Sequence, residues 1–352
     1  MSVSALDFGT TRTGQPVHLY RMVNVNGMEV DVTDIGASIV SVRIPTSDGN
    51  LVDVALGYDE CVSYEHNGGA LGGTVGRVCN RIAGATYTLD DRTAHLTANE
   101  GDSCLHGGRD MWYERLWDGA VIGRKGQRRK GSLADTATFG LFSEDLDQGF
   151  PGDVDVRVTY QLTDDNEIAI TYDAQPTIET LINLTNHTYW NLNGHDSGSV
   201  LGHTLCVAAD TYTPVDAKNI PTGEIATVEG TPFDFREPKT IGRDLTDEFG
   251  GYDHNFVIGN GRRKTHRAAS LIGDLTGIRM DIFTELPDLQ VYTGQGLDVL
   301  VGKDGASYGP FAGIALETQF APDAIHHPNF AQPVFSPERP FQWRTVLRFS
   351  LT

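Results

Sequence analysis

The chain has 352 residues, long enough for two average domains or for one large β-sandwich or barrel, and its composition is that of a globular protein. Its 47 acidic and 27 basic residues give a formal net charge of −20, which repels nucleic-acid phosphates and anionic membrane surfaces. The composition therefore disfavours both as partners and favours a neutral or weakly charged small ligand.

Period-two alternation of apolar and polar residues dominates the chain and predicts β-strands. The clearest case is residues 153–162, where Val154 to Leu162 alternate with polar residues before a turn and a second run over 168–172. Similar strands are expected near residues 28–44, 51–56, 86–90, 180–192, 204–209, 255–258, 278–284, 288–293 and 312–320. With 40 glycines and 15 prolines for turns, the sequence predicts an all-β antiparallel sandwich or barrel, a single domain over residues 1–352.

Two basic stretches, residues 123–131 and 261–267, are short and face a strongly acidic background. We interpret them as exposed loops and not as nucleic-acid surfaces. The cysteines are far apart, without a CxxC pair, and are expected to be buried free thiols: Cys61, Cys79, Cys104 and Cys206. The first residues lack a signal-peptide pattern, and no apolar run reaches membrane-span length, so we expect a cytoplasmic protein.

Three expected strands have a polar face that could line a cleft. The segment 181–192 alternates apolar residues with hydrogen-bonding ones, and the latter face carries Asn183, Thr185, His187, Tyr189 and Asn191. In residues 313–320, Glu317 and Gln319 share a face with two small residues that would let a ligand approach. Taken alone, this segment favours a solvated surface position for Glu317 over a pocket position. A third face carries Gln290 and Tyr292.

Three further residues are candidates for ligand binding. His106 lies in a glycine-rich segment that favours a loop, where a histidine can bind a ligand or be purely structural. Arg81 follows the run GGALGG, which lacks the strand–GxGxxG–helix context of a nucleotide-binding loop. Asp253 could orient a hydroxyl group or cap a turn.

Nine segments together strongly resemble the aldose 1-epimerase, or galactose mutarotase, family. They keep the family's order over residues 75 to 325 and are GRVCNRI (76–82), LHGG (105–108), DQGFPGD (147–153), NLTNHTYWNLNGH (183–195), TPVD with IPTGEI (213–225), TPFDF (231–235), YDHNF (252–256), VYTG (291–294) and ALETQ with PDA (315–324). The resemblance implies a large antiparallel β-sandwich, of the mutarotase-like supersandwich type, with an open carbohydrate-binding cleft. It also implies an isomerase that interconverts the α and β anomers of free aldoses such as galactose and glucose.

Carried over residue by residue, the resemblance makes Glu317 the general base and His187 the general acid. It assigns substrate binding to Asn80, Arg81, His106, Asp253 and Gln290, and it requires no cofactor or metal. The ordinary pKa values of Glu and His, roughly 4.3 and 6.5, let a base and an acid coexist near neutrality. A protonated His187 is expected to keep Glu317 ionised.

Three alternatives stay open. A non-catalytic carbohydrate-binding protein would keep the cleft without turnover, and a glycoside hydrolase would pair Glu317 with Asp253. A metal site would need several of the histidines at positions 106, 187, 326 and 327, whose spacing matches no ligand motif. The sequence leaves open the roles of His326 and His327 and the preferred aldose. The expected partner is a monosaccharide, bound by a monomer or a homodimer.

Overall fold

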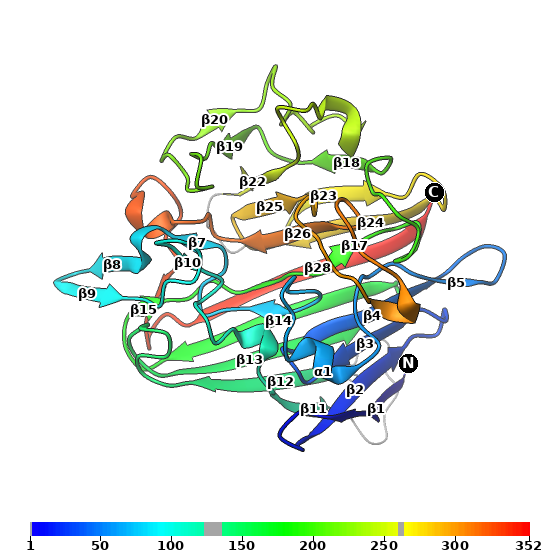
Figure 1. The fold of residues 1–352 in the computed structure, drawn as a ribbon, viewed down its shortest axis with the longest axis horizontal. Coiled ribbons are helices and arrows are strands. Elements are labelled where there is room, and N and C mark those ends of the chain that lie inside the picture. The colour runs from blue at the N-terminus through cyan, green and yellow to red at the C-terminus, as the bar shows by residue number, and fades with distance from the viewer. Residues whose placement is uncertain (1, 123–135, 260–263) are drawn as a thin grey trace.

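The computed structural model describes residues 2–122, 136–259 and 264–352, and antiparallel strands dominate it (Figure 1). Nine strands form the largest sheet, in the spatial order β11-β12-β13-β14-β28-β24-β23-β18-β21. Their bounds are β11 Asp118–Ile122, β12 Thr136–Ser143, β13 Val154–Leu162, β14 Glu167–Pro176, β18 Thr204–Val207, β21 Lys239–Thr240, β23 His266–Ile272, β24 Ile278–Thr284 and β28 Phe341–Leu351.

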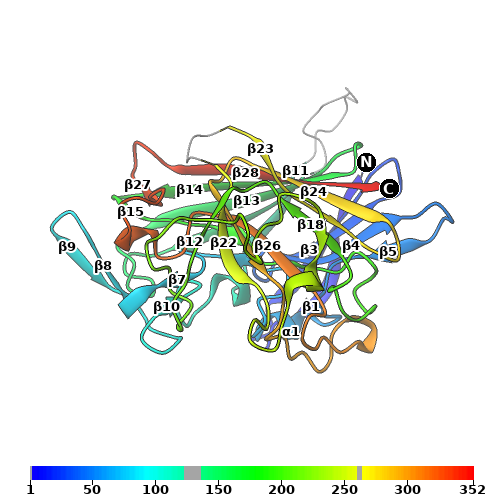
Figure 2. The same cartoon turned by 90° about the horizontal axis from the view of Figure 1, so that it is seen from above.

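Two further sheets lie against it. A five-stranded sheet runs in chain order and consists of β1 Ser2–Thr10, β2 Pro16–Val23, β3 Glu29–Thr33, β4 Ser38–Pro45 and β5 Leu51–Asp53. A six-stranded sheet has the order β17-β26-β25-β22-β19-β20, with bounds β17 Tyr189–Trp190, β26 Ile314–Gln319, β25 Asp288–Tyr292, β22 Asp253–Val257, β19 Thr211–Thr213 and β20 Ala226–Thr227. Seen from above, β14 and β28 lie over β22 and β26, as two layers (Figure 2).

The remaining elements are short and join the sheets. Four two-stranded sheets pair β6 Thr74–Val75 with β16 Thr185–Asn186, β7 Arg81–Ile82 with β10 Cys104–Leu105, β8 Thr86–Leu89 with β9 Arg92–His95, and β15 Thr180–Leu181 with β27 Val334–Phe335. The helical turns are α1 Cys61–Tyr64, η1 Ala83–Ala85, η2 Trp112–Glu114, η3 Ile241–Asp244, η4 Lys303–Gly305 and η5 Ala324–His326. No helix among the described residues is long and apolar enough to cross a membrane.

One large hydrophobic core lies between the layers. Along β13, every second residue from Val154 to Leu162 is buried, and the residues between are more exposed, as the sequence predicted. The same core takes apolar side chains from all three large sheets. A hydrogen bond of 2.7 Å between Thr318 of β26 and Thr345 of β28 crosses it. The all-β antiparallel sandwich predicted from the sequence is confirmed.

Strand β26 differs from β13 because all six of its residues are buried. Ile314, Leu316 and Thr318 face the core, so alternation turns Ala315, Glu317 and Gln319 to the opposite face. Loops cover that second face, and Glu317 therefore lies in a protein-lined space. The possibility that Glu317 is a solvated surface residue is wrong, since its residue exposure is 2%.

The prediction of a continuous strand over residues 180–192 is wrong. The segment is broken into β15, β16 and β17 because its backbone pairs in turn with several different parts of the chain. Asn183 bonds to Arg77 and Cys79, whereas the His187 amide donates to the carbonyl oxygen of Gly73. Local alternation cannot reveal such changes of partner, which depend on distant residues.

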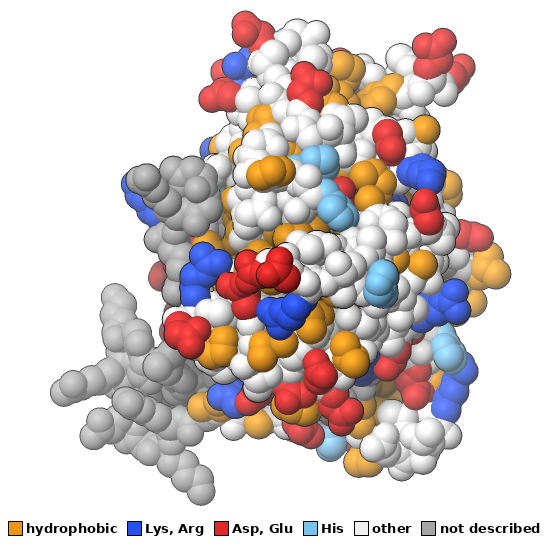
Figure 3. Space-filling view, turned by 90° about the vertical axis from the view of Figure 1, so that its left-hand side faces the viewer, with side chains coloured by type: hydrophobic (Ala, Val, Ile, Leu, Met, Phe, Trp, Pro, Cys, Tyr) orange, Lys and Arg blue, Asp and Glu red, His pale blue; other side chains and the backbone are white. Residues whose placement is uncertain are grey.

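Two smaller expectations have mixed outcomes. All four cysteines are free, but Cys206 is only half-buried, because β18 lies beside the short β21 near the edge of its sheet. The basic stretch 123–131 lies outside the described residues. Of the stretch 261–267, residues 261–263 also lie outside them, and His266 and Arg267 belong to β23 instead of a loop. Acidic side chains are scattered over the face shown in Figure 3.

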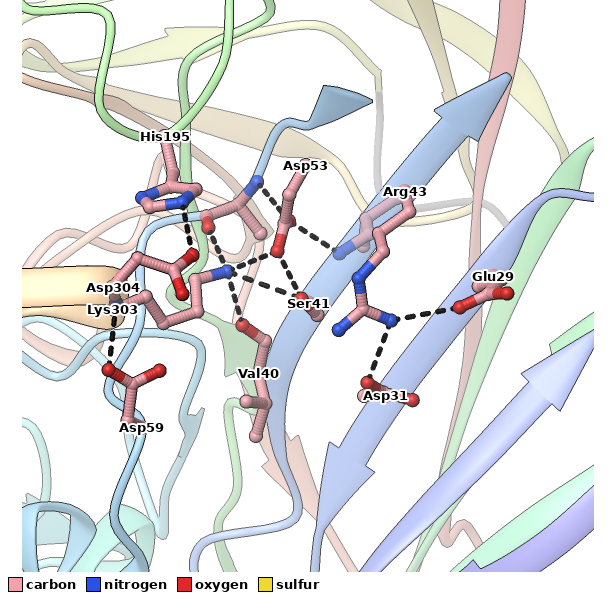
Figure 4. Close-up of polar contacts among 12 residues, drawn as sticks. Glu29, Asp31, Val40, Ser41, Arg43, Asp53, Asp59, His195, Lys303 and Asp304 are labelled. Atoms are coloured by element: carbon pink, nitrogen blue, oxygen red, sulfur yellow. Dashed lines mark hydrogen bonds and ion pairs between the residues drawn. The ribbon is translucent and has the colours of Figure 1, made fainter. Parts of the chain in front are cut away.

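A buried lysine fastens one long loop to the sheet beside it. The Lys303 ammonium donates to the carboxylate of Asp53 at 2.7 Å and to the carbonyl oxygens of Val40 and Ala55 at 2.8 and 2.7 Å (Figure 4). It is 6% exposed, and its charge is satisfied by one opposite charge and two backbone dipoles. The contact joins η4 to β4 and to the end of β5.

We expect Lys303→Ala to lower the free energy of unfolding by about 3 kcal/mol or more, because it leaves the Asp53 carboxylate buried without its partner. Urea unfolding at neutral pH measures the change. Lys218→Ala is the matched control, since Lys218 pairs with Asp102 at the surface, where both side chains are about two-thirds exposed. That loss should be below about 1 kcal/mol. Equal losses in the two variants would contradict the interpretation of Lys303 as a buried anchor.

Candidate active site

A pocket of about 990 Å³ opens on the face of the six-stranded sheet that is turned away from the core. Its floor is polar and includes Glu317 and His187, and its walls come from loops of distant parts of the chain. Its polar and charged lining includes Asn80, Arg81, Glu100, His106, His187, Asp253, Asp298 and Glu317. Tyr58, Tyr113, Tyr189 and Tyr292 add aromatic surface. Such a mixture suits a ligand with hydroxyl groups and C–H faces.

The register of β17 and β26 brings His187 and Glu317 together. Tyr189 lies opposite Ala315 in this pair of strands, so His187, just before β17, comes close to Glu317, two residues further along β26. Nε2 of His187 lies 3.6 Å from Oε1 of Glu317, and the side chains are 6% and 2% exposed. An ionisable acid–base pair therefore sits at the pocket floor, shielded from bulk water.

Burial drives both groups toward their neutral forms. It raises the pKa of Glu317 to about 8, with a smaller contribution from the Asp253 carboxylate, and it lowers the pKa of His187 to about 4. Oε2 of Glu317 and Nδ1 of His187 also lack a hydrogen-bond partner among the described residues. The expectation of ordinary pKa values, with His187 keeping Glu317 ionised, is wrong, because desolvation penalises each charged form.

His106 and Asn80 hold each other at the pocket edge. The Asn80 amide donates to Nδ1 of His106 at 3.1 Å, and the His106 amide donates to the Asn80 carbonyl oxygen at 3.0 Å. Nδ1 of His106 is therefore an acceptor, and its ring proton sits on Nε2. Both residues have left-handed backbone angles, φ 53° and 60°, a strained conformation for residues other than glycine. His106 lies in a turn just after β10, as the sequence predicted.

A chain of hydrogen bonds and one ion pair crosses one side of the pocket. Arg81 donates to the Glu100 carboxylate from Nε and Nη2, at 2.6 and 2.9 Å. Its Nη1 lies 3.6 Å from Oδ2 of Asp253, and Gln290 donates to Oδ1 of the same carboxylate at 2.6 Å. Gln290 in turn lies opposite Glu317 in the register of β25 and β26. These contacts link Glu100 at the pocket edge to the strand that carries Glu317.

Six of the seven candidate residues predicted from the sequence line this pocket: Asn80, Arg81, His106, Asp253, His187 and Glu317. Gln290 does not line the pocket, but its side-chain amide donates a hydrogen bond to the carboxylate of Asp253, which does. Sequence reasoning missed Glu100. The one pointer to this residue in the sequence is its position five residues before the LHGG motif. His326 and His327 do not line the pocket, and both contact the Asp323 carboxylate, at 2.6 and 3.4 Å.

The arrangement has the chemistry of an acid–base catalyst for a small polyhydroxy ligand. No three His, Cys, Asp or Glu side chains in the described part of the chain are grouped so that they could hold a metal ion. The rings of His106 and His187 are close, with centroids 5.4 Å apart. His326 and His327, the other two histidines of the possible metal site, do not line this pocket.

Comparisons with known proteins identify the class. The aldose 1-epimerase family model matches residues 18–348. Human galactose mutarotase is 37% identical over 326 residues, 92% of each chain, and an Escherichia coli aldose 1-epimerase is 38% identical over 328 residues, 91% of each chain. A crystal structure of an aldose epimerase homologue from C. elegans superposes with a TM-score of 0.86 at 28% identity, covering both chains fully.

The chain therefore belongs to the aldose 1-epimerase family, as the resemblance of its motifs implied. It is an isomerase that interconverts the α and β anomers of a free aldose. A solved galactose 1-epimerase from Lactobacillus acidophilus also matches over its length, with a TM-score of 0.84, 25% identity and coverage of 100% of this chain and 99% of that one.

The raised pKa of Glu317 predicts how the unfolding free energy of the protein changes with pH. Its pKa is about 8 in the folded protein and near 4.5 when unfolded, so the folded state binds the proton more tightly. The resulting stabilisation is complete below pH 4.5 and is lost as the pH rises toward 8. We expect Glu317→Gln, which cannot ionise, to gain at least about 1 kcal/mol of unfolding free energy over wild type between pH 5 and pH 8.

Urea unfolding of both proteins at pH 5, 6, 7 and 8 measures this difference. Glu338→Gln, at an exposed glutamate, is the control for removing a carboxylate from the surface. Parallel stability curves for wild type and Glu317→Gln would show that Glu317 ionises as easily in the folded protein as in the unfolded chain, contrary to the account.

Proposed function

We propose that the pocket binds a neutral hexose such as galactose or glucose in its pyranose form, and that Glu317 and His187 catalyse its ring opening and closure. The observation that carries this proposal is the buried pair at the pocket floor, with Nε2 and Oε1 3.6 Å apart. The names of the relatives, which mention galactose, support the choice of sugar.

Anomer exchange needs two proton transfers. Glu317 accepts the proton of the O1 hydroxyl as the C1–O5 bond breaks, and His187 gives a proton to O5, which leaves an open-chain aldehyde. After rotation about the C1–C2 bond, O5 attacks the other face of the carbonyl. His187 then recovers its proton from O5, and Glu317 returns a proton to O1. Each turnover ends with both groups as they began, and general acid–base catalysis of this kind is worth about 10²–10⁴-fold per group.

The reactive state needs ionised Glu317 and protonated His187, whereas burial favours the neutral forms of both. The two states contain the same single proton. Moving it from Glu317 to His187 therefore requires no exchange with solvent, only a short transfer inside the pair. A sugar hydroxyl that donates to the carboxylate stabilises its charged form and favours that transfer. Substrate binding thus favours the state with ionised Glu317 and protonated His187.

Positioning falls to the residues around the pair. His106 offers an Nε2 proton, while Arg81, Asp253, Asn80 and Gln290 hold the edge of the sugar ring through the hydrogen-bond chain described above. Fixing the pyranose so that O1 meets Glu317 and O5 meets His187 turns two ordinary groups into effective catalysts.

We also propose that the chain works as one domain, in the cytoplasm, as a monomer or homodimer with no macromolecular partner. The family match over residues 18–348 supports one domain, and the four free cysteines fit a reducing compartment. The net charge of −20 disfavours nucleic acid.

We expect Glu317→Gln and His187→Gln each to lower kcat for mutarotation at least about 100-fold, because each removes one proton-transfer group. Polarimetry of freshly dissolved α-D-galactose and α-D-glucose measures the rate above that of buffer. Glu338→Gln, at an exposed residue that does not line the pocket, is the control and should keep the wild-type rate. A wild-type rate equal to that of buffer would favour a sugar-binding protein, and full activity in either pocket variant would contradict the assigned role.

A further inference from the structure

Arg81 is the one Lys or Arg among the described residues that line the pocket. It is also the group to which an anionic ligand would be drawn, since a guanidinium binds carboxylates and phosphates through paired N–H groups. In this chain that pairing is already made. Nε and Nη2, the two donors on one edge of the guanidinium, both bond to the Glu100 carboxylate.

Glu100 is held firmly enough to keep this edge occupied. It begins a tight turn in which its amide and carbonyl both bond to Ser103, at 3.2 and 2.9 Å. The side chain of the preceding Asn99 bonds to the backbone of Leu105 and Gly108 on either side of His106. The turn is thus part of the same frame that places His106, and the carboxylate of Glu100 is a fixed feature of the pocket wall.

The charges around Arg81 oppose an anion as well. Its remaining nitrogen faces Asp253, and the lining also includes Asp298 on the opposite loop. Burial lowers the pKa of both His106 and His187, so neither offsets these carboxylates with a positive charge near neutrality. Lys218 lies near the turn but pairs with Asp102 and does not line the pocket. Among the described lining residues the single Lys or Arg side chain, Arg81, is therefore already paired.

We propose that Glu100 is a specificity-determining residue that reserves the pocket for neutral aldoses by withholding Arg81 from the anionic group of a uronate or a sugar phosphate. The inference rests on the proposed function and adds a residue to it. Glu100 is 42% exposed at the pocket edge, whereas Arg81 is 11% exposed, so an incoming anion meets the carboxylate together with the guanidinium. Discrimination then follows from charge and from an occupied donor pair, not from pocket size.

The test compares D-galacturonate with D-galactose. Both have a free anomeric hydroxyl and the same pyranose ring, and they differ in a carboxylate that replaces the C6 hydroxymethyl group. Polarimetry gives kcat/KM for each sugar with wild type, Glu100→Gln and Asp298→Asn. Glutamine at position 100 can still accept one hydrogen bond from Arg81 but carries no charge, so it separates orientation from electrostatics.

We expect Glu100→Gln to raise the galacturonate-to-galactose ratio of kcat/KM about tenfold, in line with the loss of one charge a few ångströms from the ligand in a partly screened pocket. Both sugars are compared within each variant, so a change in turnover that is common to galactose and galacturonate leaves the ratio unaffected. Asp298→Asn removes a carboxylate from the same lining without touching Arg81 and should change the ratio less than threefold. Glu100→Ala should shift the ratio in the same direction as Glu100→Gln, and its circular dichroism spectrum checks the fold.

An unchanged ratio in both Glu100 variants, with galactose turnover intact, would overturn this inference and leave the proposed function standing. An equal rise of this ratio in Asp298→Asn would also overturn the inference. The discrimination would then come from the total negative charge of the pocket and not from the pairing of Glu100 with Arg81. Absence of galactose turnover in the wild type would instead contradict the proposed function itself.

Discussion

The rest of the site depends on one constraint, the burial of a glutamate and a histidine side by side with a single proton between them. Neither Glu317 nor His187 is stable as an isolated charge at the pocket floor, and burial shifts the two pKa values in opposite directions. Over the interval between those values the pair holds one proton, and in the proposed mechanism the two ways of placing it are the resting and the reactive states. The pairing of β17 with β26 sets the distance that makes them one unit.

The surrounding structure serves this pair in two ways. The core between the large sheets occupies one face of β26, and the other face turns the Glu317 carboxylate, which we propose as the general base, into the pocket. Loops from distant parts of the chain then close the pocket, and one of them is fastened by Lys303 to the neighbouring sheet (Figure 4). Unpartnered buried atoms such as Oε2 of Glu317 cost stability in the empty protein. This is a common balance at functional sites.

Sequence patterns predicted the strands that keep the same neighbours along their whole length. Strand β13 is an example, since it pairs with β12 on one side and with β14 on the other. They failed between residues 180 and 192, where successive residues pair with different segments. The motif resemblance located the candidate residues, because Glu317, His187 and His106 lie within long ordered patterns. It could not show that burial shifts the pKa values of the pair, or that Glu100 occupies Arg81, since both depend on contacts between segments far apart in the chain.

The pH dependence of kcat/KM for D-galactose tests the shared proton most directly, because this parameter reports the ionisation of the free enzyme. The account predicts a plateau between about pH 4 and pH 8, with activity falling below as His187 becomes protonated beside neutral Glu317, and above as the pair loses its last proton. Polarimetry corrected for the buffer rate gives both limbs. An acidic limb near 6.5, the ordinary value for histidine, or a rate that keeps rising above pH 8, would contradict the shared proton.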